Sequence, residues 1–183
     1  MTEPDPMATG EARIVAGWNG RLFEDFKVGD VYYHPFVKTV TQADNQMFTL
    51  MTQNVAKTHV DVNFASATEF ERPLMNSTFV LALVTGQSTI DLSMNAFANL
   101  GWDEVRLPHP VFEGDTIYSR SRVLASRPSK SRPSVGIVDV ATEGFNQDGV
   151  VVIRFQRTFM VYRRGHLPEV ESSRPKADFP VMP

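Results

Sequence analysis

Residues 77–92, STFVLALVTGQSTIDL, form the longest helical pattern in the chain. The large apolar side chains of this stretch recur at helical spacing, at Phe79, Val80, Leu83, Val84 and Ile90. Polar side chains are sparse along it, and a helix that is apolar on most sides is usually buried. We therefore expect one long helix that begins near Ser77 and is buried against a sheet.

The hydrophobic pattern changes from helical to strand-like after Met94. Four strand candidates follow one another, at residues 97–107, 115–126, 135–146 and 150–162. In the last of these, apolar side chains alternate with polar ones, and Arg157 alone interrupts the apolar face. Asn146-Gln147-Asp148-Gly149 predicts a hairpin turn, because Asp-Gly tolerates the positive φ that such turns require. Long consecutive strands of this kind predict an antiparallel sheet.

The segment before the long helix predicts a short strand followed by a helix. The strand covers residues 36–40. Thr41 followed three residues later by Asp44 resembles a capping box, with Asp in place of the usual Glu. This box opens a helix through Met51, on which Met47, Leu50 and Met51 form one apolar stripe.

A second short helix is predicted after it. Asp61 is a good N-cap for this helix, which runs through Phe70. His59 is then expected in a loop between the two small helices. The order of elements predicts an α+β domain in which one long helix lies across a curved antiparallel sheet.

Composition narrows the function classes. The 183 residues suit a single domain, which we expect at residues 21–164 between tails at 1–20 and 165–183. The formal net charge of −3 gives no reason to expect a nucleic-acid partner. Because cysteine is absent, disulfides, zinc thiolate sites and a thiol nucleophile are excluded. We see no secretory signal and no apolar run near the ~20 residues of a membrane span, so we expect a cytoplasmic protein without membrane segments.

Three strings resemble the MaoC-like hydratase family. They are FEDFKVGD at residues 23–30, KTVT at 38–41 and HPVFEGDT at 109–116. The resemblance implies the hotdog fold over residues 21–164, with a central helix wrapped by the sheet. It also implies an acyl-CoA thioester substrate, bound at the interface of a homodimer or larger oligomer. No cofactor is implied beyond the coenzyme A that the substrate carries.

The family's central motif, Gly-Asp-x-Asn-Pro-apolar-His, aligns with residues 53–59, QNVAKTH. His59 is retained at the motif's distance, whereas Asn54 occupies the position of the aspartate and Ala56-Lys57 that of the Asn-Pro pair. The asparagine, together with EFERPLMNS at residues 69–77, resembles the mesaconyl-CoA hydratase or β-methylmalyl-CoA dehydratase branch. That branch implies a short, branched or dicarboxylic enoyl-CoA.

The candidate catalytic groups follow from this alignment. Hydration of an enoyl thioester needs a group that moves a proton between water and carbon near neutral pH. His59 is the candidate general acid and base, or else a histidine that lies on the surface or caps a helix. Asn54 has no basicity, but its amide is a candidate for positioning the water, or it simply completes the turn after a helix. Asp61 either tunes His59 or acts only as an N-cap.

The start of the long helix is the candidate oxyanion site. Asn76 and Ser77 lie where backbone N–H groups and the positive end of the helix dipole can face a thioester carbonyl. A plain N-cap role for either residue is compatible with this. Arg72 is the candidate partner for a second substrate carboxylate, or else a solvated loop arginine.

The remaining candidates are weaker. Lys130 and Arg132 lie in a basic loop that suits the phosphates of coenzyme A but is equally ordinary as a surface loop. His34, His109 and His166 have no partners at metal-ligand spacing, so no metal is expected.

Two alternatives to the hypothesis of a hydratase or dehydratase, that is, a hydro-lyase, stay open. The first is a hotdog thioesterase, for which Asp61 or Asp44 is the available carboxylate base. The second is a non-catalytic acyl-CoA-binding subunit. The residues at Asn54 and Ala56 favour this subunit, whereas retention of His59 opposes it.

Overall fold

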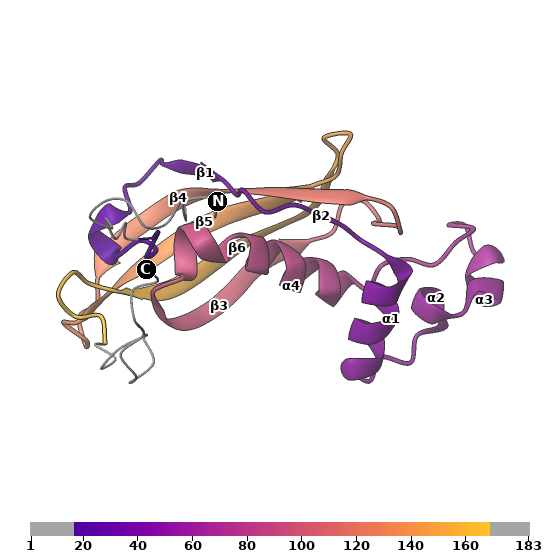
Figure 1. The fold of residues 1–183 in the computed structure, drawn as a ribbon, viewed down its shortest axis with the longest axis horizontal. Helices are drawn as coiled ribbons and strands as arrows, with labels where there is room; N and C mark the ends of the chain where they lie inside the picture. The colour runs from indigo at the N-terminus through magenta and orange to yellow at the C-terminus, as the bar shows by residue number, and fades with distance from the viewer. Residues whose placement is uncertain (1–16, 169–183) are drawn as a thin grey trace, which may run out of the picture.

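The computed structural model describes residues 17–168, which form an α+β domain with one antiparallel sheet and a central helix, α4, across one of its faces (Figure 1). The helical elements are η1 (Phe23–Asp25), α1 (Gln42–Met51), α2 (Lys57–Val60), α3 (Val62–Ser66), α4 (Ser77–Gln87) and the π-helical turn η2 (Thr89–Ser93). The strands are β1 (Val31–Tyr33), β2 (Lys38–Thr39), β3 (Ala96–Arg106), β4 (Thr116–Pro128), β5 (Val135–Phe145) and β6 (Val151–Tyr162). This arrangement confirms the predicted fold class.

The strand order in the sheet is β1-β4-β5-β6-β3, and β2 pairs with β4 beside β1. All pairs are antiparallel. The predicted hairpin between β5 and β6 is confirmed: Gly149 has a φ of 75°, and the Asn146 side chain accepts hydrogen bonds from the N–H groups of Asp148 and Val150. Within the described residues, β3 pairs on one side only and therefore forms an edge of the sheet.

The core lies between α4 and the sheet. Val80 and Val84 of α4 are buried in a cluster with side chains of the strands, which include Ile117, Val152, Ile153 and Phe155. Gly144 of β5 permits the close approach of the helix, because a Cβ at this position would lie 2.6 Å from the Val84 side chain. α4 is thus fixed against the middle of the sheet, which positions its N-terminal turn.

Several local predictions differ from the structure. The helix predicted from Asp61 through Phe70 is shorter, because α3 ends at Ser66. Of the strand predicted at residues 36–40 only Lys38–Thr39 pairs, and β1 was not predicted. The helix predicted to reach residue 92 ends at Gln87, and the π-helical turn η2 follows it. At this point the Ser88 hydroxyl donates to the Thr85 carbonyl oxygen at 2.6 Å and competes with the regular hydrogen bonds of the helix. His59 was expected in a loop but lies in α2, since Ala56 and Lys57 permit a helical turn.

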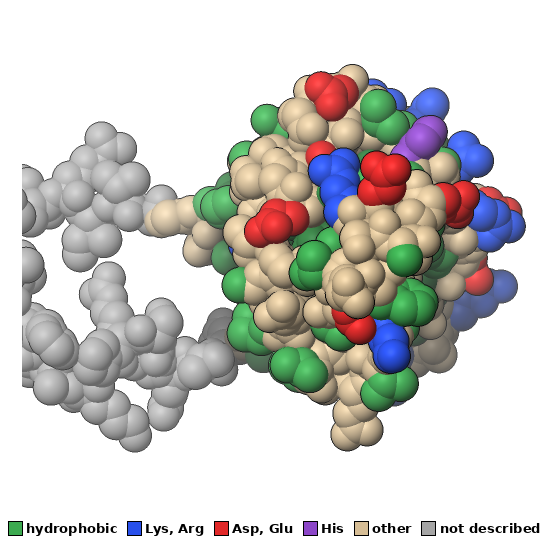
Figure 2. Space-filling model, turned by 90° about the vertical axis from the view of Figure 1, so that its right-hand side faces the viewer, with side chains coloured by type: hydrophobic (Ala, Val, Ile, Leu, Met, Phe, Trp, Pro, Cys, Tyr) green, Lys and Arg blue, Asp and Glu red, His purple; other side chains and the backbone are tan. Residues whose placement is uncertain are grey.

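Helices α1, α2 and α3 lie beyond the end of the sheet, next to the start of α4 (Figure 1). The capping box of Thr41 and Asp44 and the N-cap role of Asp61 are both confirmed. The predicted apolar stripe of α1 faces outward, however, with Leu50 73% exposed. Figure 2 looks onto this end and shows hydrophobic side chains scattered among polar and charged ones. The face of α1 that is turned inward carries Asn45 and Thr49 instead.

The predicted tails fall mostly outside the described residues. At the described N-terminal end, the Trp18 indole donates to the Ile90 carbonyl oxygen at 3.1 Å, so this part of the chain contacts η2. No helix within residues 17–168 is long and apolar enough to cross a membrane.

Candidate active site

A fully buried asparagine of α1, Asn45, joins three segments of the chain. Its amide nitrogen donates to the carbonyl oxygens of His59 and Leu74, each at 2.9 Å. Its side-chain oxygen accepts a hydrogen bond from the backbone N–H of Asn76 at 2.8 Å. One side chain therefore fixes α2 and the start of α4 relative to α1. Sequence reasoning missed Asn45, because a polar residue in the second turn of a helix carries no local signal of burial.

His59 is half-buried, and the structure determines which of its nitrogens is available. Nδ1 lies 2.9 Å from the Leu74 carbonyl oxygen. A carbonyl oxygen only accepts, so Nδ1 carries the hydrogen in the neutral ring and Nε2 carries the lone pair. Within residues 17–168 no hydrogen-bond partner occupies Nε2. The ring is thus held at one nitrogen and can take up a proton at the other.

The N-terminal turn of α4 begins beside this histidine. Asn76 is buried and acts as the N-cap: its side-chain oxygen accepts from the Thr78 N–H at 3.0 Å. In the described part of the chain, the N–H groups of Ser77 and Phe79 have no acceptor. Two unpaired donors at the positive end of a helix can stabilise a developing oxyanion. The predicted cap and the predicted oxyanion site are therefore compatible at this position.

Asn54 lies in the turn between α1 and α2. Its side-chain oxygen accepts from the Ala56 N–H at 3.0 Å, and its own N–H donates to the Thr49 carbonyl oxygen. The turn role considered from the sequence is thus present. No hydrogen bond joins Asn54 to His59 within the described residues, so the amide NH₂ is the group left to hold a water.

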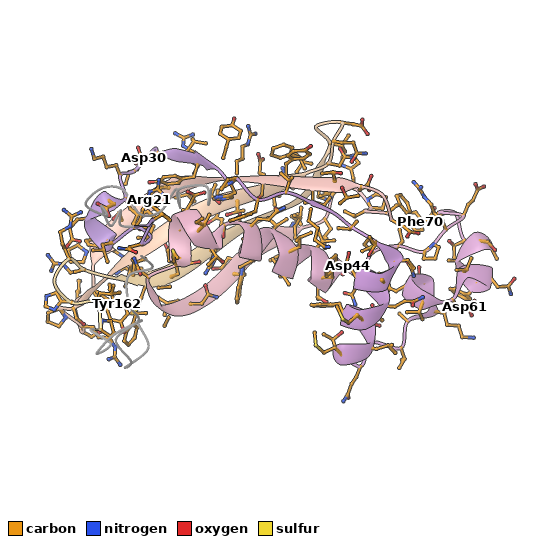
Figure 3. The ribbon with its side chains drawn as sticks, viewed as in Figure 1. Arg21, Asp30, Asp44, Asp61, Phe70 and Tyr162 are labelled. Carbon is orange, nitrogen blue, oxygen red and sulfur yellow. The ribbon has the colours of Figure 1, made fainter. Side chains whose placement is uncertain are left out.

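The two nearby carboxylates are occupied as helix caps. Asp61 accepts from the Phe64 N–H at 2.9 Å, at the start of α3. Asp44 accepts from Thr41 and pairs with Lys38 at 3.1 Å. Burial opposes ionisation of Asp44, but these hydrogen bonds outweigh it and keep its pKa below the ordinary value. Figure 3 labels both carboxylates on the helices beyond the sheet.

The predicted cations lie in two different parts of the domain, Arg72 in the loop before α4 and the basic pair between β4 and β5. The Arg72 guanidinium is exposed and stacks over the Phe112 ring, 3.8 Å from its centroid. Lys130 and Arg132 lie in the turn between β4 and β5, at the end of the sheet away from α1–α3 (Figure 1). The structure therefore does not bring the basic loop to His59 of the same chain.

A second histidine, His34, forms a buried polar chain that the sequence did not reveal. Nδ1 lies 2.9 Å from an Asp91 oxygen, and Nε2 lies 2.9 Å from the Ser121 hydroxyl, which in turn contacts Thr142 at 2.8 Å. The Asp-His-Ser order resembles that of hydrolases, but the His34 side chain is 0% exposed. Burial lowers the pKa of His34 more than Asp91 raises it. We assign the hydrogen bonds of His34 a structural role, because they connect Asp91 of η2 to Ser121 of β4.

Comparison with known proteins identifies the family. The model of the mesaconyl-CoA hydratase family matches residues 1–174. The chain belongs to this family. It is 31% identical over 170 residues to the β-methylmalyl-CoA dehydratase of Chloroflexus aurantiacus, covering 88% of this chain and 48% of that protein. The chain spans about half the length of the curated relatives it matches.

Solved structures agree with this assignment. A MaoC domain dehydratase from Chloroflexus aurantiacus superimposes with a TM-score of 0.79 at 31% identity, covering 88% of this chain and 46% of that one. A Mycobacterium tuberculosis protein with a double hotdog fold gives a TM-score of 0.75 at 21% identity, which supports the fold alone, and covers 87% of this chain and 53% of that one. The predicted MaoC-like resemblance and the hotdog fold are confirmed.

Proposed function

We propose that this chain carries the site of an acyl-CoA hydro-lyase, which adds or removes water at the double bond of an enoyl-CoA thioester. The observation that carries the proposal is the arrangement of His59. Its Nδ1 is held by the carbonyl oxygen of Leu74, which lies two residues before the N-cap of α4. Its Nε2 has no hydrogen-bond partner among the described residues. The family assignment supports the same reaction class.

In the hydration direction, Nε2 of His59 removes a proton from water as the water oxygen bonds to the β-carbon. The electron pair of the double bond moves toward the thioester oxygen, where the N–H groups of Ser77 and Phe79 stabilise the negative charge. The imidazolium then returns its proton to the α-carbon, so one water is added in total. The Asn54 amide NH₂ donates to the attacking water and holds it in place.

The position of the carboxylates disfavours the thioesterase alternative. A carboxylate base would have to direct water at the thioester carbonyl. The Asp44 carboxylate, however, accepts from the N-cap residue Thr41 of α1, and the Asp61 carboxylate accepts from Phe64 in the first turn of α3. Moving either one into the site would cost a helix cap, typically about 1 kcal/mol.

We also propose that the acyl group carries a second carboxylate. The names of the related enzymes, mesaconyl-CoA hydratase and β-methylmalyl-CoA dehydratase, support this substrate class. Arg72 is exposed, and within residues 17–168 no acidic side chain pairs with it, so its guanidinium is available to a carboxylate.

The assembly we propose is a dimer in which two sheets continue through their β3 edges. Phe97, Leu100 and Trp102 of β3 are large apolar side chains that are at least 39% exposed. An unpaired edge strand with exposed apolar side chains is a template for pairing with another strand.

The test is to incubate the protein with a panel of short enoyl-CoA and hydroxyacyl-CoA esters and to follow each product by mass. We expect gain or loss of one water and no free coenzyme A. His59→Gln should lower kcat/KM by roughly 10²- to 10⁴-fold, whereas the matched control His166→Gln, an exposed histidine, should not. Asn54→Ala should cost less than His59→Gln. Release of free coenzyme A would indicate a thioesterase, and absence of any product would indicate the non-catalytic subunit.

A further inference from the structure

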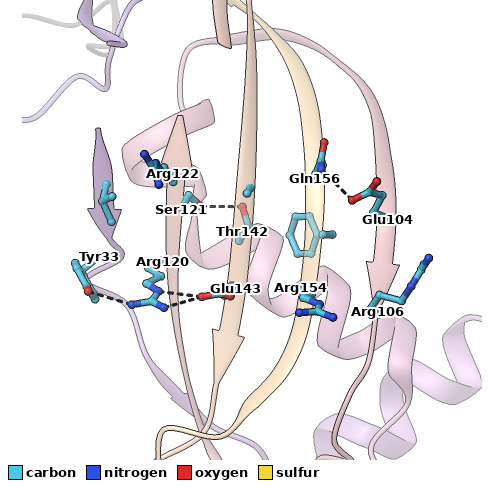
Figure 4. A pocket seen from close by; sticks show the side chains of 13 residues that line it. Tyr33, Glu104, Arg106, Arg120, Ser121, Arg122, Thr142, Glu143, Arg154 and Gln156 are labelled. Atoms are coloured by element: carbon cyan, nitrogen blue, oxygen red, sulfur yellow. Dashed lines mark hydrogen bonds and ion pairs between the residues drawn. The ribbon is translucent and has the colours of Figure 1, made fainter. Parts of the chain in front are cut away.

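The face of the sheet opposite α4 carries a groove of about 660 Å³ (Figure 4). Its charged lining consists of four arginines and two glutamates: Arg106, Arg120, Arg122, Arg154, Glu104 and Glu143. On β4 these arginines alternate with buried residues such as Ser119 and Val123, which face the core. The groove is therefore separated from His59 and from the start of α4 by the sheet itself.

The strand register places three of the arginines in one row across the sheet. Arg120 lies opposite Glu143, Glu143 opposite Arg154, and Arg154 opposite Arg106. Glu143 is bound to Arg120, with nitrogen–oxygen distances of 2.8 and 3.0 Å. Arg154 and Arg106 thus face each other as like charges in neighbouring strands, an arrangement that destabilises a sheet.

Neither arginine of this pair forms a salt bridge in the described part of the chain. No carboxylate of residues 17–168 lies within 4.0 Å of the guanidinium of Arg106, Arg122 or Arg154. Glu104, the second acid in the groove, accepts from Gln156 at 3.0 Å instead. The groove thus has an excess of positive charge on a chain whose formal net charge is −3. An anion bound between the arginines would relieve their repulsion.

We propose that this groove binds the phosphates of a nucleotide-sized organic anion. Guanidinium groups match phosphate oxygens in a bidentate manner and stay charged at all physiological pH values. The volume lies within the range of about 300–1,000 Å³ that is usual for small-molecule sites. The exposed side chains of Val31 and Tyr33 form an apolar wall against which a ring can lie. The phosphates come either from the nucleotide end of coenzyme A or from a free nucleotide.

Titration calorimetry with ADP, inorganic pyrophosphate and coenzyme A tests this site. We expect saturable binding of ADP, weakened roughly tenfold by Arg106→Gln and by Arg154→Gln. Arg127→Gln is the matched control, because Arg127 is an exposed arginine of the same strand as Arg122 but lies outside the groove. Without ligand, Arg106→Gln should leave the Tm unchanged or raise it, since a like-charge pair is removed.

ADP and coenzyme A also distinguish the two sources of the phosphates. If both variants weaken the binding of coenzyme A as much as the binding of ADP, the groove holds the nucleotide end of coenzyme A. If they weaken only the binding of ADP, the groove binds a free nucleotide. The proposal is overturned if ADP does not bind saturably to the wild type, or if Arg127→Gln weakens it as much as the groove variants do. None of the ligands carries an acyl group, so this outcome is independent of the hydro-lyase test.

Discussion

Replacing Asn45 with leucine tests whether one buried side chain holds the candidate active site together. Leucine has a similar volume but removes the donations to the His59 and Leu74 carbonyl oxygens and the acceptance from the Asn76 N–H. The two carbonyl oxygens keep other donors, the Gln42 amide at 2.8 Å and the His59 ring at 2.9 Å. The Asn76 N–H, which is buried, keeps none.

These losses set the expected magnitude. A buried donor without a partner lowers the free energy of unfolding by about 1–3 kcal/mol. The loss of a hydrogen bond whose partner is still satisfied by another group lowers it by about 0.5–1.5 kcal/mol. We therefore expect Asn45→Leu to lower the free energy of unfolding by roughly 2–6 kcal/mol. This is a large part of the total free energy of unfolding of a typical domain, which is about 5–15 kcal/mol.

Urea unfolding measures this change as a lower midpoint at constant m-value. Gln46→Leu is the matched control, because Gln46 is the exposed neighbour of Asn45 on α1. A midpoint for Asn45→Leu equal to that of Gln46→Leu would refute the role assigned to Asn45.

Three further predictions concern acid stability, substrate choice and assembly. Burial keeps the pKa of His34 below 6.5, so the unfolded chain binds the proton first as the pH falls, and the folded state loses stability below that value. His34→Gln should therefore flatten the decline of Tm with falling pH. An unchanged slope would contradict the assignment. Arg72→Ala should weaken the use of dicarboxylic acyl-CoA about tenfold while sparing crotonyl-CoA, because one charge-assisted bond is lost; equal loss on both esters would assign Arg72 to its packing on Phe112 or to coenzyme A. Light scattering should show a dimer at micromolar concentration for the wild type and a monomer for Leu100→Lys, which places a charge on the β3 edge; a monomeric wild type would rule the interface out.

The parts of the fold that follow from local signals were predictable. The Asp-Gly hairpin, the capping box at Thr41 and the apolar helix after Ser77 each depend on residues within one element. The His34 chain was not predictable, because its partners Asp91 and Ser121 lie 57 and 87 residues away. Spacing along the sequence cannot reveal such contacts.

The direction in which α1 faces could not be predicted for a related reason. Met47, Leu50 and Met51 form the apolar stripe predicted for α1, but this stripe is exposed, and Asn45 and Thr49 face the inside. The neighbouring segments present carbonyl and N–H groups at that position, and a buried backbone group must be paired. A polar side chain satisfies these groups, whereas an apolar stripe would leave them without partners.

The same reasoning accounts for an asparagine at position 54. Asn54 accepts from the Ala56 N–H and so completes the turn that leads into α2, the helix that carries His59. An amide supplies both an acceptor for the turn and an NH₂ donor for a water, while an ionised carboxylate supplies only acceptors. With Asp44 and Asp61 occupied as caps, the mechanism that we propose assigns proton transfer to His59. A single base that is held at Nδ1 and unoccupied at Nε2 can both take a proton from water and return it to carbon, so the absence of a carboxylate at position 54 is compatible with hydro-lyase chemistry.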